Sequence, residues 1–261
     1  MTAALILDCD GVLAETELDG HLVAFNRAFD ELGFGFHWTA DEYDPLLKVG
    51  GGKERLRAFL QQNPEIDLGS GAELDANILA AHKLKSSIYV DLVQDGALPA
   101  RPGIARLVRE ALDDGWQVAC ASTSAERSVE AVLNTILGPD QRARMAGVFA
   151  GDIVDAKKPA PDIYLLTAQE IGRSADEVVV IEDSQSGAAA AAAAGMAHLV
   201  TVSHFTAQDS FPAATTVVDH LGESDRPATV RAGVDVRNTR GFVDLDGIAA
   251  VLAAHSDSVT R

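Results

Sequence analysis

The chain has 261 residues, a formal net charge of −18 at pH 7 and 47% hydrophobic residues. Its length allows more than one average domain and a sizeable buried core. The acidity excludes nucleic acid as an expected partner, because such binding depends on Lys and Arg that neutralise phosphates. It would also repel a phosphorylated substrate, so an anion site has to be locally basic. No apolar run reaches 18 residues, which excludes an expected membrane-spanning helix.

The cysteines and the start of the chain indicate the compartment. Cys9 and Cys120 both fall in apolar runs that predict buried strands, so a reduced, cytoplasmic protein is expected. The first residues carry no basic segment, and the apolar stretch that follows ends at Asp8, so no secretory signal is predicted. We expect a monomer whose partner is a small molecule.

The first predicted element is a buried strand that ends in two carboxylates. Residues 4–7 are apolar, and Asp8, Cys9, Asp10 and Gly11 follow them. Open α/β sheets bind ligands at this end of their strands. Two carboxylates so close together repel each other, and a hard divalent cation would compensate them. The alternative is a solvated turn, since Asp and Gly are common in turns.

A block without a convincing strand follows, from residue 15 to 95. Hydrophobic spacing predicts helices over residues 18–32, 39–47, 54–60 and 73–92. Thr39 and Glu42 have the spacing of a capping box at the start of the second helix, and the three glycines at 50–52 form a turn before the third. This block predicts a small helical bundle inserted after the first strand.

From residue 101 onward, strands alternate with helices. Strands are predicted at 117–121, 148–150, 178–181, 198–202 and 217–218, and helices at 104–112, 126–137, 163–171, 187–195 and 246–254. This alternation is typical of a Rossmann-like, doubly wound parallel α/β sheet. We therefore expect an α/β core formed by residues 1–14 and 96–261, with residues 15–95 as the inserted helical domain. Residues 222–240 have no clear period.

Polar side chains follow four of the predicted strands or loops. They are Asp8 and Asp10; Ser122, Thr123 and Ser124; Lys158; and Glu182 and Asp183. A parallel sheet brings the carboxyl ends of its strands to one edge, so these four clusters are expected to converge. The alternatives are a helix cap at Ser122, a solvated loop lysine at 158, and acids that favour a helix N-terminus at 182 and 183.

Four segments carry a resemblance to a known family. They are DCDGV at 8–12, the hydroxyl after VACA at 118–121, KPAPDIY at 158–164 and VIEDSQSGAAAAAAAGM at 180–196. In this order they resemble the four motifs of the haloacid dehalogenase superfamily of phosphohydrolases and phosphomutases. The helical insert resembles its type 1 cap. DCDGVLAETE, HLVAFNRAF and GGGKERL resemble the CbbY-like group, which is similar to β-phosphoglucomutases and includes phosphatases of xylulose 1,5-bisphosphate.

The resemblance implies a division of roles among the clustered residues. Asp8 would be the nucleophile that forms an aspartyl-phosphate, and Asp10 the general acid and base. Lys158, Ser122 and nearby amides would contact the phosphoryl oxygens. Mg²⁺ would bind Asp8, the backbone carbonyl of Asp10 and Asp183, with Glu182 directly or through water. This oxygen-rich set suits Mg²⁺.

The substrate is expected to contact the helical insert as well. Candidate binding residues are Glu17, His21, Gly51, Gly52, Lys53, Arg55, His82 and Lys85 in the insert, and Thr123 and Ser124 in the core. The basic ones would bind a second phosphate and Glu17 a sugar hydroxyl, whereas the alternative is an exposed basic helix face. His21 is either a core histidine or a link to Asp10. GGGKER is not a P-loop, because no strand precedes it and no Ser or Thr follows the Lys.

These features predict a Mg²⁺-dependent sugar (bis)phosphate phosphatase, with a xylulose 1,5-bisphosphate-like substrate. A phosphomutase would use the same residues and differ in how long the aspartyl-phosphate survives. A non-catalytic sugar-phosphate-binding regulator is the alternative from another class, although all four motifs are intact. A second DxDG at 244–247 has no accompanying motifs and is interpreted as a helix start capped by Asp244 or Asp246.

Overall fold

The structure, a computed structural model, describes residues 3–259, which form two compact units. One unit consists of the chain up to Glu15 together with the chain from Pro99 onward, and the other is Thr16–Leu98. We call them the core and the helical insert. Among the described residues, no helix has the length and apolar character needed to cross a membrane.

The core is built on a seven-stranded sheet in the order β3-β2-β1-β4-β5-β6-β7. Its strands are β1 (Ala4–Leu7), β2 (Gln117–Ser122), β3 (Gly147–Ala150), β4 (Val178–Glu182), β5 (Ala197–Thr201), β6 (Thr216–Val218) and β7 (Val230–Gly233). All neighbouring strands from β3 to β6 are parallel. The strand order reverses between β1 and β4, where ligands bind in such sheets. The predicted Rossmann-like α/β fold is confirmed.

The last strand differs from the sequence-based expectation. β7 pairs antiparallel with β6 and lies within residues 222–240, for which no element was predicted. The sequence of β7 is VRAG, and three of its four residues are exposed. An edge strand that buries so little carries no alternation of apolar and polar residues, so its pairing with β6 is a purely tertiary feature.

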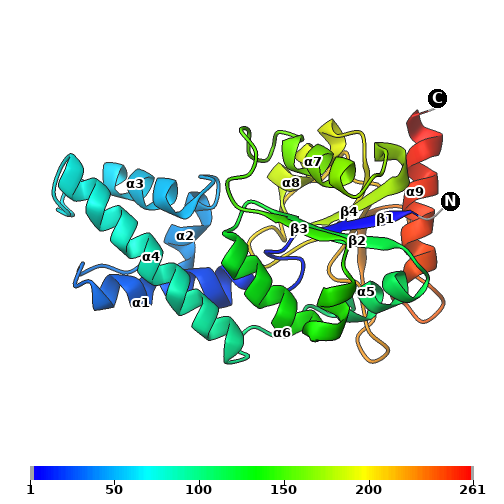
Figure 1. Cartoon of the computed structure of the whole chain (residues 1–261), viewed down its shortest axis with the longest axis horizontal. Coiled ribbons are helices and arrows are strands. Elements are labelled where there is room, and N and C mark those ends of the chain that lie inside the picture. Colours follow the sequence, from blue (N-terminus) through cyan, green and yellow to red (C-terminus); the bar gives the residue numbers. More distant parts are fainter. Residues whose placement is uncertain (1–2, 260–261) are drawn as a thin grey trace. The chain divides into compact units, whose positions relative to one another are not determined.

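Helices cover both faces of the sheet in the core. They are α5 (Ile104–Asp113), α6 (Glu126–Arg144), α7 (Asp162–Glu170), the short 3-10 helix η2 (Ala175–Glu177), α8 (Gln185–Ala193) and α9 (Leu245–Val259). Helices α7 and α8 lie on one side of the sheet and α5 and α6 on the other (Figure 1). α6 extends past its predicted end at Leu137, through a non-helical break at Gly138.

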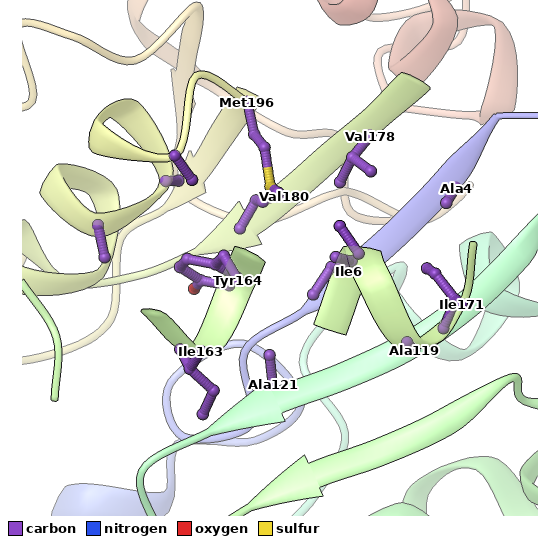
Figure 2. Close-up of a cluster of buried hydrophobic side chains, with 14 residues drawn as sticks. Ala4, Ile6, Ala119, Ala121, Ile163, Tyr164, Ile171, Val178, Val180 and Met196 are labelled. Atoms are coloured by element: carbon purple, nitrogen blue, oxygen red, sulfur yellow. The ribbon is translucent and has the colours of Figure 1, made fainter. Parts of the chain in front are cut away.

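A cluster of buried side chains joins α7 and α8 to the sheet (Figure 2). Val180 of β4 and Met196 pack beside Tyr164 of α7. The alanine run contributes Ala190, Ala191 and Ala194 to this cluster. Alanine has no bulk beyond its Cβ, so α8 can lie close to the sheet, and that rigid contact supports the end of β4.

The start of α9 agrees with the expected helix cap. The Asp244 carboxylate accepts a hydrogen bond from the backbone N–H of Gly247 at 3.1 Å. This is the geometry of an N-cap residue. The second DxDG sequence is thus a helix start, as interpreted, and Asp244 is its capping residue.

The helical insert consists of a π-helical turn and four α-helices. They are η1 (Glu17–Leu22), α1 (Val23–Glu31), α2 (Ala40–Leu46), α3 (Gly52–Gln62) and α4 (Ala72–Gln94). α1 packs along α4, and in the interior the Trp38 ring makes tilted or edge-on contacts with the rings of Phe25, Phe29, Tyr43 and Phe59. Thr39 and Glu42 form the predicted capping box at the start of α2.

Candidate active site

The centre of the candidate site is the junction between the ends of β1 and β4. Asp8 directly follows β1, and its N–H donates to Ile181 of β4 at 3.0 Å. Glu182 ends β4, and Asp183 follows it. All three carboxylates are buried. They lie where the strand order reverses, so the fold itself concentrates negative charge at its expected binding position.

Lys158 joins two of these carboxylates. Its Nζ donates to Asp8 Oδ1 at 2.6 Å, to Glu182 Oε1 at 2.7 Å and to the carbonyl oxygen of Ala121 at 3.2 Å. The Lys158 side chain is only 8% exposed. Burial lowers its pKa, but Asp8 and Glu182 outweigh this effect and hold the pKa well above its usual value. Lys158 is therefore a fixed cation in the site, which excludes the solvated-loop alternative.

Glu182 accepts hydrogen bonds at both of its carboxylate oxygens. Oε1 accepts from Lys158 and from the Tyr164 hydroxyl, while Oε2 accepts from the N–H groups of Asp183 and Ser184 and from the Ser184 hydroxyl. Burial raises its pKa, but Lys158 and these donors lower it below the usual value. The Glu182 carboxylate thus stays ionised and orients Lys158. Tyr164 was not singled out from the sequence, although it lies in KPAPDIY.

Asp8 and Asp183 have fewer compensating partners than Glu182. Burial raises the pKa of Asp8 to about 7, with Lys158 opposing the rise and Glu182 and Asp10 adding to it. Burial raises the pKa of Asp183 well above its usual value, with Glu182 and Asp8 adding to the rise and Ser203 and Arg101 opposing it. Oxygens of Asp8, Glu182 and Asp183 all lie within 4.8 Å of one another. This set of hard oxygen donors fits a divalent cation such as Mg²⁺.

Gly11 explains how the chain passes so close to these acids. It has a φ of +71°, and a Cβ built on it would lie 1.9 Å from Asp183 Oδ2. Only glycine satisfies both the backbone conformation and the close approach. The loop that carries Asp10 therefore lies directly against Asp183, and any side chain at position 11 would displace one of them.

The hydroxyl side chains that follow the buried part of β2 make different contacts. The Ser124 hydroxyl donates to Asp10 Oδ2. Ser122 is buried, and its Oγ accepts from the N–H of Ser124 at 3.1 Å. Thr123 is half-buried between them. Ser124 is thus the residue that orients the candidate acid and base. The Ser122 hydroxyl braces the turn and keeps its own proton available for another acceptor.

In the helical insert, one network surrounds a buried arginine. Arg55 of α3 is 8% exposed, and its Nη1 donates to the Tyr43 hydroxyl. Tyr43 in turn donates to Glu17 Oε2 at 2.7 Å, and Arg55 Nη1 lies 3.5 Å from the same oxygen. The structure thus joins two predicted residues, Glu17 and Arg55, through a tyrosine that the sequence analysis missed.

A second pair in the insert brings together Lys85 and His21. Lys85 Nζ lies 2.7 Å from His21 Nδ1 and above the rings of Phe25 and Tyr89, at 5.0 and 5.2 Å from their centroids. Both predicted residues are buried. Burial of a lysine is costly, and the two rings offset part of that cost.

The other predicted residues of the insert lie at the start of α3 and on α4. Gly51 precedes α3 with a φ of +94°, and Gly52 begins it. A Cβ on Gly52 would lie 3.0 Å from the His82 ring. Lys53 is exposed. The geometry therefore makes Arg55 and Lys85, rather than Lys53, the enclosed cations of this unit.

Comparisons with known proteins agree with this geometry. The profile of the haloacid dehalogenase-like hydrolase family matches residues 2–195. The chain is 44% identical to the CBBY-like protein of Arabidopsis thaliana over 85% of this chain and 70% of that protein. It is also 44% identical to the plasmid-encoded protein CbbY of Cupriavidus necator, over 86% and 87% of the two chains.

Solved structures give the same result. The crystal structure of CbbY from Rhodobacter sphaeroides in complex with phosphate has a TM-score of 0.76 and 37% identity, over 84% of this chain and 95% of that one. A variant of the same protein, crystallised with xylulose-(1,5)bisphosphate, matches equally well. The predicted enzyme class, a phosphoric monoester hydrolase of CbbY-like type, is confirmed.

Proposed function

From the premise that this chain belongs to the haloacid dehalogenase-like hydrolase family, we propose that it is a Mg²⁺-dependent phosphatase of a ketopentose bisphosphate similar to xylulose 1,5-bisphosphate. The observation that carries the proposal is the buried group of Asp8, Asp183 and Glu182 around a single lysine. Three carboxylates against one cation leave a deficit of positive charge. A divalent cation and a phosphoryl group that arrive together would balance it.

The proposed reaction starts at Asp8. Its carboxylate oxygen attacks the phosphorus atom, forms an aspartyl-phosphate and releases the sugar oxygen, which takes a proton from Asp10. Asp10 then removes a proton from the water that hydrolyses the aspartyl-phosphate. The bond from Ser124 holds the Asp10 carboxylate in one orientation for both proton transfers. Bound Mg²⁺ would offset the negative charge of the phosphoryl group and the surrounding carboxylates.

Three residues would support this chemistry. Lys158 is placed to donate to phosphoryl oxygens while it stays paired with Glu182. Glu182 in turn keeps Lys158 ionised and fixed. The Ser122 hydroxyl would donate to the transferred group. Groups preorganised in this way typically contribute about 3–4 kcal/mol each to transition-state stabilisation.

The helical insert would confer specificity for the substrate. It encloses two cations, Arg55 and Lys85, and Arg55 lies 3.5 Å from the Glu17 carboxylate. Enclosed cations support binding of a second phosphate in an otherwise acidic chain. Glu17 would accept a hydrogen bond from a sugar hydroxyl. The relative crystallised with xylulose-(1,5)bisphosphate supports a substrate of this class.

Phosphate release across a panel of sugar mono- and bisphosphates tests the proposal. We expect preference for xylulose 1,5-bisphosphate, a requirement for Mg²⁺ and loss of activity in Asp8→Asn. Similar slow release from many sugar phosphates would contradict the proposed specificity. Conversion of β-glucose 1-phosphate to the 6-phosphate without release would favour the mutase. Binding of the bisphosphate without any turnover would favour the regulator.

A further inference from the structure

The core contains a buried arginine that none of the roles above includes, and it contacts the loop that carries Asp10. Arg101 lies just before α5, at the point where the chain has re-entered the core, and is 7% exposed. It belongs to none of the four motifs. Burial of a guanidinium is costly unless its donors are paired, so its partners indicate what it holds.

Arg101 binds the far end of the loop that carries Asp10. We call residues 10–15 the acid loop. The Arg101 guanidinium donates to the Glu15 carboxylate, and its backbone N–H donates to the carbonyl oxygen of Leu13 at 2.9 Å. A bridge between Ala14 and Ala100 joins the same two segments. The last residues of the acid loop are therefore fixed to residues 100 and 101.

The same guanidinium also binds the ends of two strands. Its Nη2 donates to the carbonyl oxygens of Val202, after β5, at 2.7 Å and of Asp219, after β6, at 2.6 Å. The other oxygen of Glu15 accepts from the N–H of His204 at 3.1 Å. One ion pair thus connects the acid loop with the carboxyl ends of β5 and β6.

The acid loop leads from Arg101 to the candidate site. At the start of this loop, Gly11 lies against Asp183, and its N–H donates to the carbonyl oxygen of Ala14 at 3.0 Å. Burial raises the pKa of the Asp183 carboxyl, and Ser203, which directly follows Val202, and the Arg101 guanidinium both act to lower it. The acid loop thus connects Arg101 with a candidate metal ligand.

We infer that Arg101 is a positioning residue, which acts with Glu15 to hold the acid loop and the ends of β5 and β6 as one rigid support for Asp10 and Asp183. Arg101 itself does not react. Its planar guanidinium binds a carboxylate and two carbonyl oxygens at once, which the point charge of a lysine cannot reproduce. Residues that orient metal ligands typically affect metal affinity by about 10–100-fold.

Arg106 provides a matched control. It lies on α5, its side chain is 12% exposed, and it also donates to two carbonyl oxygens, those of Gly222 at 3.0 Å and Val243 at 2.9 Å. Neither contact is made to the acid loop or to Asp183. Arg106→Met should therefore cost stability in the same way as Arg101→Met without disturbing the site.

The test compares hydrogen exchange of the metal-free proteins with their affinity for Mg²⁺. In Arg101→Met we expect exchange at least tenfold faster over residues 11–15 and 202–204, and Mg²⁺ binding at least tenfold weaker by calorimetry. Arg106→Met should keep wild-type values for both and exchange faster near residues 222 and 243. Equal exchange of the two variants over residues 11–15, or unchanged Mg²⁺ affinity in Arg101→Met, would overturn the inference.

Two milder variants keep the inference testable if Arg101→Met does not fold. Arg101→Lys keeps the charge, and Glu15→Gln keeps the shape of its partner. Each should accelerate exchange of the His204 amide and weaken Mg²⁺ binding severalfold, and wild-type values in both would overturn the inference. The Mg²⁺ readout rests on the proposed function. The exchange readout in the metal-free protein is independent of it, so failure of the two ideas can be told apart.

Discussion

The core site and the helical insert differ in the charge of their buried side chains. In the core, three buried carboxylates, those of Asp8, Glu182 and Asp183, lie together, and Lys158 pairs with the first two. In the insert, the cations Arg55 and Lys85 are buried, and Arg55 lies 3.5 Å from the Glu17 carboxylate. Buried carboxylates suit a divalent cation, whereas buried cations suit an anionic group of a substrate. A Mg²⁺ ion and a bisphosphate would match these two units separately.

The difference also extends to the partners of each cation. Lys158 donates to the carboxylates of Asp8 and Glu182, and Glu182 also accepts hydrogen bonds from other donors, among them the N–H of Asp183. Lys85 Nζ lies 2.7 Å from His21 Nδ1 and above the rings of Phe25 and Tyr89. The proposed function assigns recognition to the insert and chemistry to the core, and four predictions test that division.

The largest effect is expected at Lys158. Lys158→Met should lower kcat by roughly 1,000-fold, because a preorganised donor to the transferred phosphoryl group is lost. It should also destabilise the protein by about 3 kcal/mol, since Asp8 and Glu182 lose their buried partner. Lys157→Met is the control, because Lys157 pairs with exposed Asp152 at 2.7 Å. Equal kcat values for the two variants would contradict the assigned role of Lys158.

In the insert, Arg55→Met should selectively impair bisphosphates. We expect KM for the bisphosphate to rise about 30–100-fold, which corresponds to the loss of one charge-assisted contact. KM for a monophosphate should change little. Arg57→Met is the matched control, because Arg57 lies on the same helix and pairs at 2.5 Å with exposed Asp75. A parallel loss for mono- and bisphosphates would assign Arg55 to general stability instead.

The unfolding free energy of the metal-free protein should depend on pH through the Asp8 carboxyl. The pKa of Asp8 is raised to about 7 from 3.8 by burial. Its contribution to stability is therefore complete below pH 4 and is lost as the pH rises through 7. Asp8→Asn should stabilise the metal-free protein by about 2 kcal/mol at pH 8 and have little effect at pH 4. Denaturant unfolding at both pH values measures this, and equal stability at pH 8 would refute it.

The smallest effect is expected at the start of α2. Thr39→Ala removes the hydroxyl that accepts from the N–H of Glu42 at 3.3 Å. The cost should be about 1 kcal/mol of unfolding free energy. Thr39→Ser, which keeps the hydroxyl, should restore most of it. Neither variant should alter kcat or the preference for bisphosphates, and a changed preference would mean that the cap positions Tyr43, which lies on α2 and bonds Glu17 and Arg55.

Much of the core could be predicted from the sequence because its signals are local. Each buried strand is a short apolar run, and the polar residues after Leu7, Ala121 and Ile181 mark the strand ends. Parallel pairing then brings those ends together without further information. The sequence therefore predicts that Asp8, Lys158, Glu182 and Asp183 share one site.

The less predictable residues act through long-range contacts. Tyr164 reaches Glu182 from α7, 18 residues away, and Tyr43 reaches Glu17 across 26 residues. From the sequence alone, both tyrosines are expected to be ordinary core residues. Of three consecutive hydroxyls after β2, only the backbone turn decides that Ser124 rather than Ser122 contacts Asp10. A helical bundle has no equivalent of the carboxyl edge of a parallel sheet, which brings strand-end residues together.

The sequence by itself determined the fold class, the family and the acids and lysine of the core, because strand periodicity and motif order are written in consecutive residues. Only the tertiary structure decided the antiparallel β7, the enclosure of Arg55 and Lys85, and the contacts of Arg101 with three separate segments. Those features depend on which distant groups meet. They are stabilised by burial and by charge pairs between residues that are distant in the sequence, which no local sequence pattern indicates.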